Sequence, residues 1–175
     1  MVDGARILDT ETLGDHVDRL YRAAWALCGS RPDAEDLVQD TFARVLAKPR
    51  RVRNDNDLSY LLQVLRNTFF SSRRTASRRI TTVAVPEGYE PVDPSPERRP
   101  EDVAETREVF AVIAGLKDTY RDALVAVGVV GLSYAEAAKL LKTKEATIAS
   151  RVFRARVQVA DGMEPARSGV IAGED

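Results

Sequence analysis

The segment from Gly131 to Arg156 constrains the fold of this chain most, because its pattern predicts two short helices joined by a tight turn. Ser133 is a favourable helix cap, and Glu136 three residues later completes a capping box. In the second helix, apolar residues recur at helical spacing and form one buried stripe. The stripe residues are Ile148, Val152, Ala155 and Val159. This layout is typical of a helix-turn-helix, which places its second helix in the DNA major groove.

The opposite face of that second helix is polar and carries one aromatic side chain. At about 100° per residue, Ser150, Phe153 and Arg154 point away from the apolar stripe. Phe153 suits contact with a thymine methyl or a sugar, and Arg154 suits a base edge or a phosphate. Arg151 lies nearer the packed edge, from which a long side chain can reach phosphates. The alternative for this helix alone is a solvated basic face with one stray aromatic residue.

The turn between the two helices, residues 142–144, lacks the glycine that such turns often use. A lysine in a left-handed conformation at this turn carries a modest strain cost. Small alanines, Ala137 and Ala138, let the two helices approach each other closely.

The net charge of −1 conceals strong segregation of charge along the chain. Residues 1–43 hold four basic and nine acidic side chains, whereas residues 44–80 hold ten basic and two acidic. Residues 81–135 hold five basic and ten acidic side chains, and residues 136–161 hold six basic and three acidic. Basic segments that coincide with particular helices indicate surfaces that follow phosphates. The acidic blocks suit protein contacts or the repulsion of misplaced DNA.

A proline-rich stretch divides the chain into two parts. Residues 83–102 contain five of the eight prolines and few residues that could form a core. We therefore predict an extended, flexible acidic linker over residues 81–102. It would join one helical domain at 12–80 to a second at 103–161. Because no useful run of strand-like alternation occurs, the predicted fold class is all-α, with the helix-turn-helix in the second domain.

Two helices are expected early in the first domain. One spans about Asp15–Cys28, and its apolar pattern places Cys28 in the core. The next is capped by Asp33 and follows it as far as Lys48. Its expected buried residues are Val38, Phe42, Val45 and Leu46. The carboxylates of this helix lie off that stripe and, on pattern alone, fit a solvated surface with favourable charge near a helix N-terminus.

A third helix begins near Leu58 and becomes strongly basic. Its expected buried face consists of Leu58, Leu61, Leu62, Leu65 and Phe69. The continuation Arg66–Arg79 combines five arginines with two phenylalanines. Arginines beside aromatic side chains suit single-stranded DNA, because the arginines follow the backbone while aromatic faces hold unstacked bases. A basic helix end that complements its own dipole is the alternative, but it accounts for only one or two arginines.

Four stretches together resemble the extracytoplasmic-function (ECF) sigma factors of bacterial RNA polymerase, over about residues 14–160. DAEDLVQDTFARVL resembles the helix that binds the polymerase clamp, and SYLLQVLRN resembles the helix that follows it in this family. The arginine run after Asn67 resembles the promoter-melting helix. GLSYAEAAKLL and ATIASRVFRAR resemble the helix-turn-helix for the upstream promoter element. Their order and spacing make the combination highly specific.

The resemblance implies roles for particular residues. The residues implied to bind the clamp of the largest polymerase subunit are Asp36, Leu37, Gln39 and Asp40. Those implied to capture a flipped base of the downstream (−10) element are Arg53, Asn54, Asp55 and Asn56. Those implied to grip the melted strand are Asn67, Arg73 and Arg74. Those implied to contact the upstream (−35) element are Ser150, Arg151, Phe153 and Arg154.

The resemblance thus implies a transcription initiation factor that binds core RNA polymerase, including the flap of its second largest subunit, and promoter DNA. It also implies an anti-sigma factor as a partner. The rival interpretations are a stand-alone DNA-binding regulator and an enzyme. For an enzyme, the single His16 has no nucleophile or metal ligands around it in the sequence, and no glycine-rich phosphate loop occurs. We expect no cofactor, no metal, no membrane insertion and a cytoplasmic location.

Overall fold

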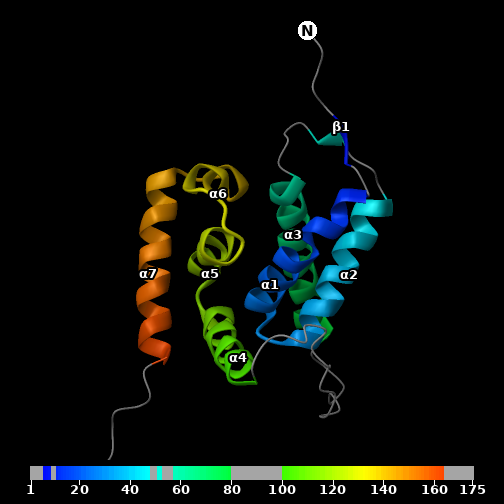
Figure 1. Cartoon of the computed structure of the whole chain (residues 1–175). Helices are drawn as coiled ribbons and strands as arrows, with labels where there is room; N and C mark the ends of the chain where they lie inside the picture. Colours follow the sequence, from blue (N-terminus) through cyan, green and yellow to red (C-terminus); the bar gives the residue numbers. More distant parts are fainter. Residues whose placement is uncertain (1–5, 9–10, 48–50, 53–56, 80–99, 164–175) are drawn as a thin grey trace, which may run out of the picture.

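The computed structural model describes residues 6–8, 11–47, 51–52, 57–79 and 100–163 (Figure 1). Almost all of this part of the chain is helical, and the predicted all-α fold is confirmed. The exception is one antiparallel pair of two-residue strands, β1 (Arg6–Ile7) and β2 (Arg51–Val52). This pair could not be predicted from the sequence, because two residues are too few to show alternation.

The N-terminal bundle consists of a short 3-10 helix and three α-helices. They are η1 (Glu11–His16), α1 (Val17–Cys28), α2 (Arg31–Ala47) and α3 (Asp57–Arg79). The five apolar residues expected to form the buried face of α3 are all buried against the other helices. Thr41 and Thr68, which are buried polar residues, direct their hydroxyls to carbonyls of their own helices. The hydrogen-bonding needs of these two buried hydroxyls are therefore met within their own helices.

Two details of α2 differ from the sequence-based expectation. The helix begins at Arg31, so Asp33 lies in its first turn and is not its cap. Ser30 takes the capping position, and its Oγ accepts a long hydrogen bond of 3.5 Å from the Asp33 amide. Leu46, expected to be buried, is 51% exposed, because Val45 fills the core and the next residue turns about 100° away from it.

The C-terminal bundle holds five helical elements. They are α4 (Pro100–Gly115), α5 (Asp118–Leu124), the π-helical turn η2 (Val125–Val129), α6 (Tyr134–Leu140) and α7 (Glu145–Met163). In Figure 1, α7 lies along one side of the molecule and packs on α4, α5 and α6. The predicted linker stretch 81–102 lies outside the described residues up to residue 99, and α4 begins at Pro100.

The two bundles pack directly against each other (Figure 1). Helix α1 lies between α2 and α3 on one side and α4 and η2 on the other, so its residues Ala23–Leu27 are all buried. Trp25 meets Phe110 of α4 edge to face, with ring centroids 4.9 Å apart. Gly29 ends α1 with a φ of 76°, and a β-carbon there would lie 2.9 Å from that of Ala114. A helix buried all round needs cover on both sides, which the C-terminal bundle supplies. Within the described ranges, no helix is long and apolar enough to cross a membrane.

Candidate nucleic-acid interface

The helix-turn-helix forms as the sequence predicts. Ser133 caps α6, and its Oγ accepts a hydrogen bond of 3.2 Å from the Glu136 amide. The Glu136 carboxylate accepts one of 2.8 Å from the Ser133 amide, which completes the capping box. The turn places Lys142 at a φ of 51°, the left-handed conformation expected of it. The Thr143 amide then donates to the carbonyl of Ala138 at 3.0 Å, which closes the end of α6.

Helix α7 presents one face to solvent and buries the opposite one. Ile148, Val152 and Ala155 are fully buried, as their spacing predicts. Ser150 and Arg154 are exposed, and Phe153 is 70% exposed. Because the Phe153 ring buries little surface within the chain, it is available for a contact outside the chain.

Tyr120 of α5 supports Arg154 from the neighbouring helix. The Arg154 guanidinium donates to the Tyr120 hydroxyl at 3.4 Å. This hydrogen bond and the nearby positive charges lower the pKa of Tyr120 below its usual range. Arg151 is partly buried beside them, at the edge of the packed face as expected. The exposed face of α7 therefore carries a positive side chain whose direction is partly fixed.

Three arginines of α3, Arg66, Arg73 and Arg74, lie on two different faces of the helix. Tyr60, Asn67 and Arg74 follow one another at intervals of seven residues and form what we call the outer face. Tyr60 and Asn67 line a hollow of about 420 Å³ between α2 and α3. The inner face consists of Arg66, Phe69, Phe70 and Arg73, and it turns towards the C-terminal bundle. The three residues implied to grip a melted strand are therefore divided between these faces.

The inner face of α3 is covered by three charged residues of α5, which we call the α5 cluster: Asp118, Arg121 and Asp122. Arg66 Nε lies 2.7 Å from Asp122 Oδ2, and the Asp122 side chain is only 4% exposed. Burial raises the pKa of the Asp122 carboxyl, and the Arg66 guanidinium opposes that rise. Arg73 lies 3.5 Å from Asp118 in a solvent-exposed pair.

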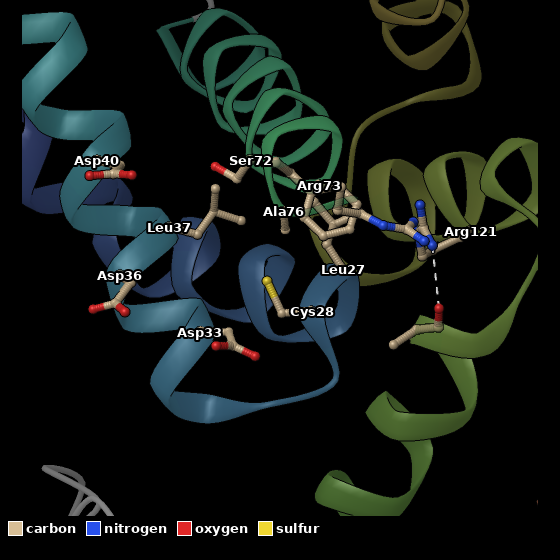
Figure 2. Close-up of a pocket in the computed structure, with 12 residues that line it drawn as sticks. Leu27, Cys28, Asp33, Asp36, Leu37, Asp40, Ser72, Arg73, Ala76 and Arg121 are labelled. Atoms are coloured by element: carbon tan, nitrogen blue, oxygen red, sulfur yellow. Dashed lines mark hydrogen bonds between the residues drawn. The ribbon is translucent and has the colours of Figure 1, made fainter. Parts of the chain in front are cut away.

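Arg121 occupies the centre of this contact and is 2% exposed. Its guanidinium carbon lies 5.1 Å from the centroid of the Phe69 ring and 6.0 Å from that of Phe70. The same guanidinium donates to Asp118 at 2.7 Å and to the Ala114 carbonyl at 3.3 Å, the bond drawn dashed in Figure 2. The positive charge is thus held by a carboxylate, a carbonyl and two aromatic rings.

The acidic face of α2 borders a groove beside this contact (Figure 2). The groove has a volume of about 570 Å³ and receives side chains from α1 to α5. Asp36 and Asp40 lie along its α2 wall, and Arg73 lies on the α3 side. Asp36, Gln39 and Asp40 are exposed, whereas Leu37 is 6% exposed and belongs to the core. Of the four residues implied to bind polymerase, three therefore lie on the surface.

Other sequence-based expectations have different outcomes. The loop Arg53–Asn56, implied to capture a flipped base, lies outside the described residues.

Sequence reasoning missed the whole α5 cluster. The signal was weak: two charged residues directly precede the apolar run Ala123–Val127, and nothing in their spacing points to a partner on α3.

Comparisons with known proteins identify both halves of the chain. Sigma-70 region 2 matches residues 13–79, and Sigma-70, region 4 matches residues 106–159. The ECF RNA polymerase sigma factor EcfG of Rhodopseudomonas palustris is 34% identical over 147 residues, which cover 80% of this chain and 76% of that protein. The chain belongs to the ECF sigma factors.

This sigma factor is also similar to SigE of Mycolicibacterium smegmatis, with 35% identity over 154 residues. That match covers 86% of the present chain but spans only 60% of the length of SigE. Among solved structures, it resembles the sigma factor RpoE of Bartonella quintana in complex with the anti-sigma factor NepR. The TM-score is 0.65 at 27% identity, and the match covers 90% of this chain and 97% of RpoE. The sigma factor is thus a protein of transcription initiation.

Proposed function

We propose that this sigma factor reads the upstream (−35) promoter element with the exposed face of α7. The observation that carries the proposal is the separation of the two faces: Ile148, Val152 and Ala155 of the apolar stripe are fully buried, while Ser150, Phe153 and Arg154 are exposed. Arg154, steadied by Tyr120, is suited to a base edge or a phosphate. Phe153 is suited to a thymine methyl, and Arg151 to a backbone phosphate.

The α2 surface is proposed to bind core RNA polymerase. Asp36, Gln39 and Asp40 present two carboxylates and an amide on one exposed helix face, which suits a basic partner surface. Leu37 supports that face from the core and does not itself lie on the surface. The partner that the family resemblance implies is the clamp of the largest subunit, with the flap of the second largest subunit meeting the C-terminal bundle.

Helix α3 and the loop before it are proposed to hold the melted −10 strand. The outer face offers the aromatic ring of Tyr60 and the amide of Asn67, which line one hollow, and the positive charge of Arg74 further along the helix. The loop Arg53–Asn56 would capture the extruded base, and Arg73 would contact the strand from the inner face. Pocket contacts would offset the unstacking cost of a few kcal/mol per base. Melting in this scheme consumes no ATP, so we propose that the protein is not an enzyme and that it acts in the cell interior beside polymerase.

An anti-sigma factor is proposed as the inhibitor of this protein. The similar RpoE was solved bound to one, NepR. The groove of about 570 Å³ beside α2 offers carboxylates and apolar side chains from both bundles. A partner seated there would cover the α2 face at the same time, and would therefore compete with polymerase.

The test is a pull-down of purified core RNA polymerase with wild-type protein and with Asp36→Arg/Asp40→Arg. We expect binding to fall at least about tenfold in the variant, because two attractive charges become repulsive. The control is Glu105→Arg/Glu108→Arg, which makes the same charge change on exposed positions of α4. Equal loss in both variants, or no loss in the first, would contradict the assignment of the α2 face. A wild-type protein that fails to bind would favour a stand-alone regulator.

A further inference from the structure

Tyr120 belongs to α5, yet its hydroxyl reaches the exposed face of α7. The two helices pack against each other, as Figure 1 shows. Nη1 of Arg154 lies 3.4 Å from the Tyr120 oxygen and donates to it. Arg154 is exposed, and it pairs with no carboxylate of the described residues. A neutral hydroxyl is therefore the group that directs this guanidinium.

A neutral partner orients an arginine without cancelling its charge. A carboxylate in the place of the Tyr120 hydroxyl would form a strong, charge-assisted pair and would compete with DNA for the guanidinium. The hydroxyl takes one N–H donor of Arg154 and leaves the others for acceptors on DNA. Because a long side chain loses rotamer entropy when it binds, orientation by Tyr120 reduces that loss for one direction of approach.

The hydroxyl of Tyr120 can also donate, and its donor is directed out of the chain. A tyrosine hydroxyl accepts and donates at the same time. The hydrogen bond from Arg154, and then the charges of Arg154, Lys117 and Arg151, lower the pKa of Tyr120. These cations cannot accept a hydrogen bond, so the hydroxyl hydrogen is left for an acceptor outside the described part of the chain. Lys117 and Arg151 also form no ion pair with a described carboxylate, so their charge favours an anionic acceptor.

We propose that Tyr120 belongs to the DNA interface and sets the specificity of Arg154: its hydroxyl directs the guanidinium to one base edge of the upstream element and donates to a phosphate beside that base. This inference deepens the proposed function and rests on it, because it needs α7 to enter the major groove. Tyr120 is a positioning residue for the base contact, since it acts there through Arg154. Lys117 and Arg151 add positive charge for the phosphate.

The direction of Arg154 decides whether it carries sequence information. Phosphates occur at every nucleotide, so an arginine that swings freely finds one on any sequence. A base edge offers its acceptors only in one place and from one direction, and the pattern differs between base pairs in the major groove. Holding the guanidinium at Tyr120 therefore favours the contact that discriminates, while the hydroxyl supplies a phosphate contact of its own.

The experiment measures how the holoenzyme, assembled from core RNA polymerase and the full chain, binds a promoter library. The library is one genomic promoter at which the wild-type protein directs initiation, with each upstream base pair substituted in turn. Titration, gel separation and sequencing of the bound fraction give the affinity for every template. The proteins are wild type, Tyr120→Phe, Arg154→Ala and the double variant, each checked by circular dichroism. The matched control is Tyr134→Phe, which removes a hydroxyl from an exposed tyrosine of α6.

We expect Arg154→Ala to abolish the preference at the base pair that Arg154 reads. Tyr120→Phe should lower the preference at that same base pair about threefold and the affinity for all templates about twofold, as expected for the loss of two modest hydrogen bonds. In the Arg154→Ala background, Tyr120→Phe should leave the base preferences unchanged and still lower the affinity for all templates alike. Tyr134→Phe should keep the base preferences of the wild-type protein.

The contrary results differ from one another. If Arg154→Ala abolishes a preference that Tyr120→Phe leaves intact, Arg154 reads DNA without Tyr120, and the inference is wrong while the proposed function stands. If Tyr120→Phe alters the preferences equally with and without Arg154, the substitution acts through the packing of α5 on α7 and the positioning role is wrong. If affinity across all templates does not fall, Tyr120 makes no phosphate contact. If Arg154→Ala changes no preference, the proposed reading by α7 is itself wrong, and the inference falls with it.

Discussion

At the scale of single residues, burial changes the acidity of the Cys28 thiol. It ends α1 and lies half-buried beside the groove between the bundles. Burial, with the Asp33 carboxylate nearby, raises the pKa of its thiol from 9.0 to about 12. Because the folded-state pKa is raised, the stability linked to this thiol is complete below pH 9 and is lost as pH rises towards 12.

We therefore expect Cys28 to resist alkylation. At pH 8 the thiolate fraction should be about a thousandfold lower than for an ordinary thiol, because the pKa rises by about three units. The chain has one cysteine, so mass spectrometry after iodoacetamide treatment reads this site alone. The urea-unfolded chain is the reference. A native rate within tenfold of the unfolded rate would show that the thiol is not protected as the structure places it.

At the scale of elements, the turn of the helix-turn-helix carries a strained residue. Lys142 adopts a φ of 51°, a conformation that glycine enters without steric cost. We expect Lys142→Gly to raise the free energy of unfolding by about 0.5 kcal/mol, since relief of strain slightly exceeds the added entropy of the unfolded chain. Urea denaturation followed by circular dichroism measures it.

The control for this turn is Lys139→Gly, which lies inside α6 and should lower the free energy of unfolding by about 1 kcal/mol. Each substitution removes one exposed lysine, so the change in charge cannot explain why one variant gains stability and the other loses it. If both variants lower the free energy of unfolding by the same amount, the left-handed conformation of Lys142 does not strain the turn.

The individual elements could be predicted from the sequence because their signals are local. The capping box at Ser133 and Glu136, the buried stripe of α7 and the apolar face of α3 all appear where their spacing places them. The two wrong predictions each concern two nearby residues that compete for one position, and residue spacing does not decide between them. Ser30 rather than Asp33 caps α2, and Leu46 stays exposed because its neighbour Val45 takes the core position.

At the scale of the whole molecule, the packing of the two bundles could not be predicted. The ion pair between Arg66 and Asp122 joins residues 56 apart in sequence. Between them lies the stretch that is predicted to be a linker because it has few core residues. Periodicity shows that a helix has an apolar face but not which partner covers it. In the structure, Ala23–Leu27 are buried on all sides of α1, because this helix packs against both bundles. The roles of individual site residues remain predictions that the variants above test.

Whether this chain directs core RNA polymerase to promoters is tested by transcription with purified core polymerase from pooled genomic promoter fragments. Sequenced transcripts should begin at a defined set of sites only when wild-type protein is added. Arg154→Ala should weaken all of these starts by about tenfold, as expected for one base or phosphate contact worth 1–3 kcal/mol. Transcription that is unchanged by adding the wild-type protein would show that the protein does not direct initiation.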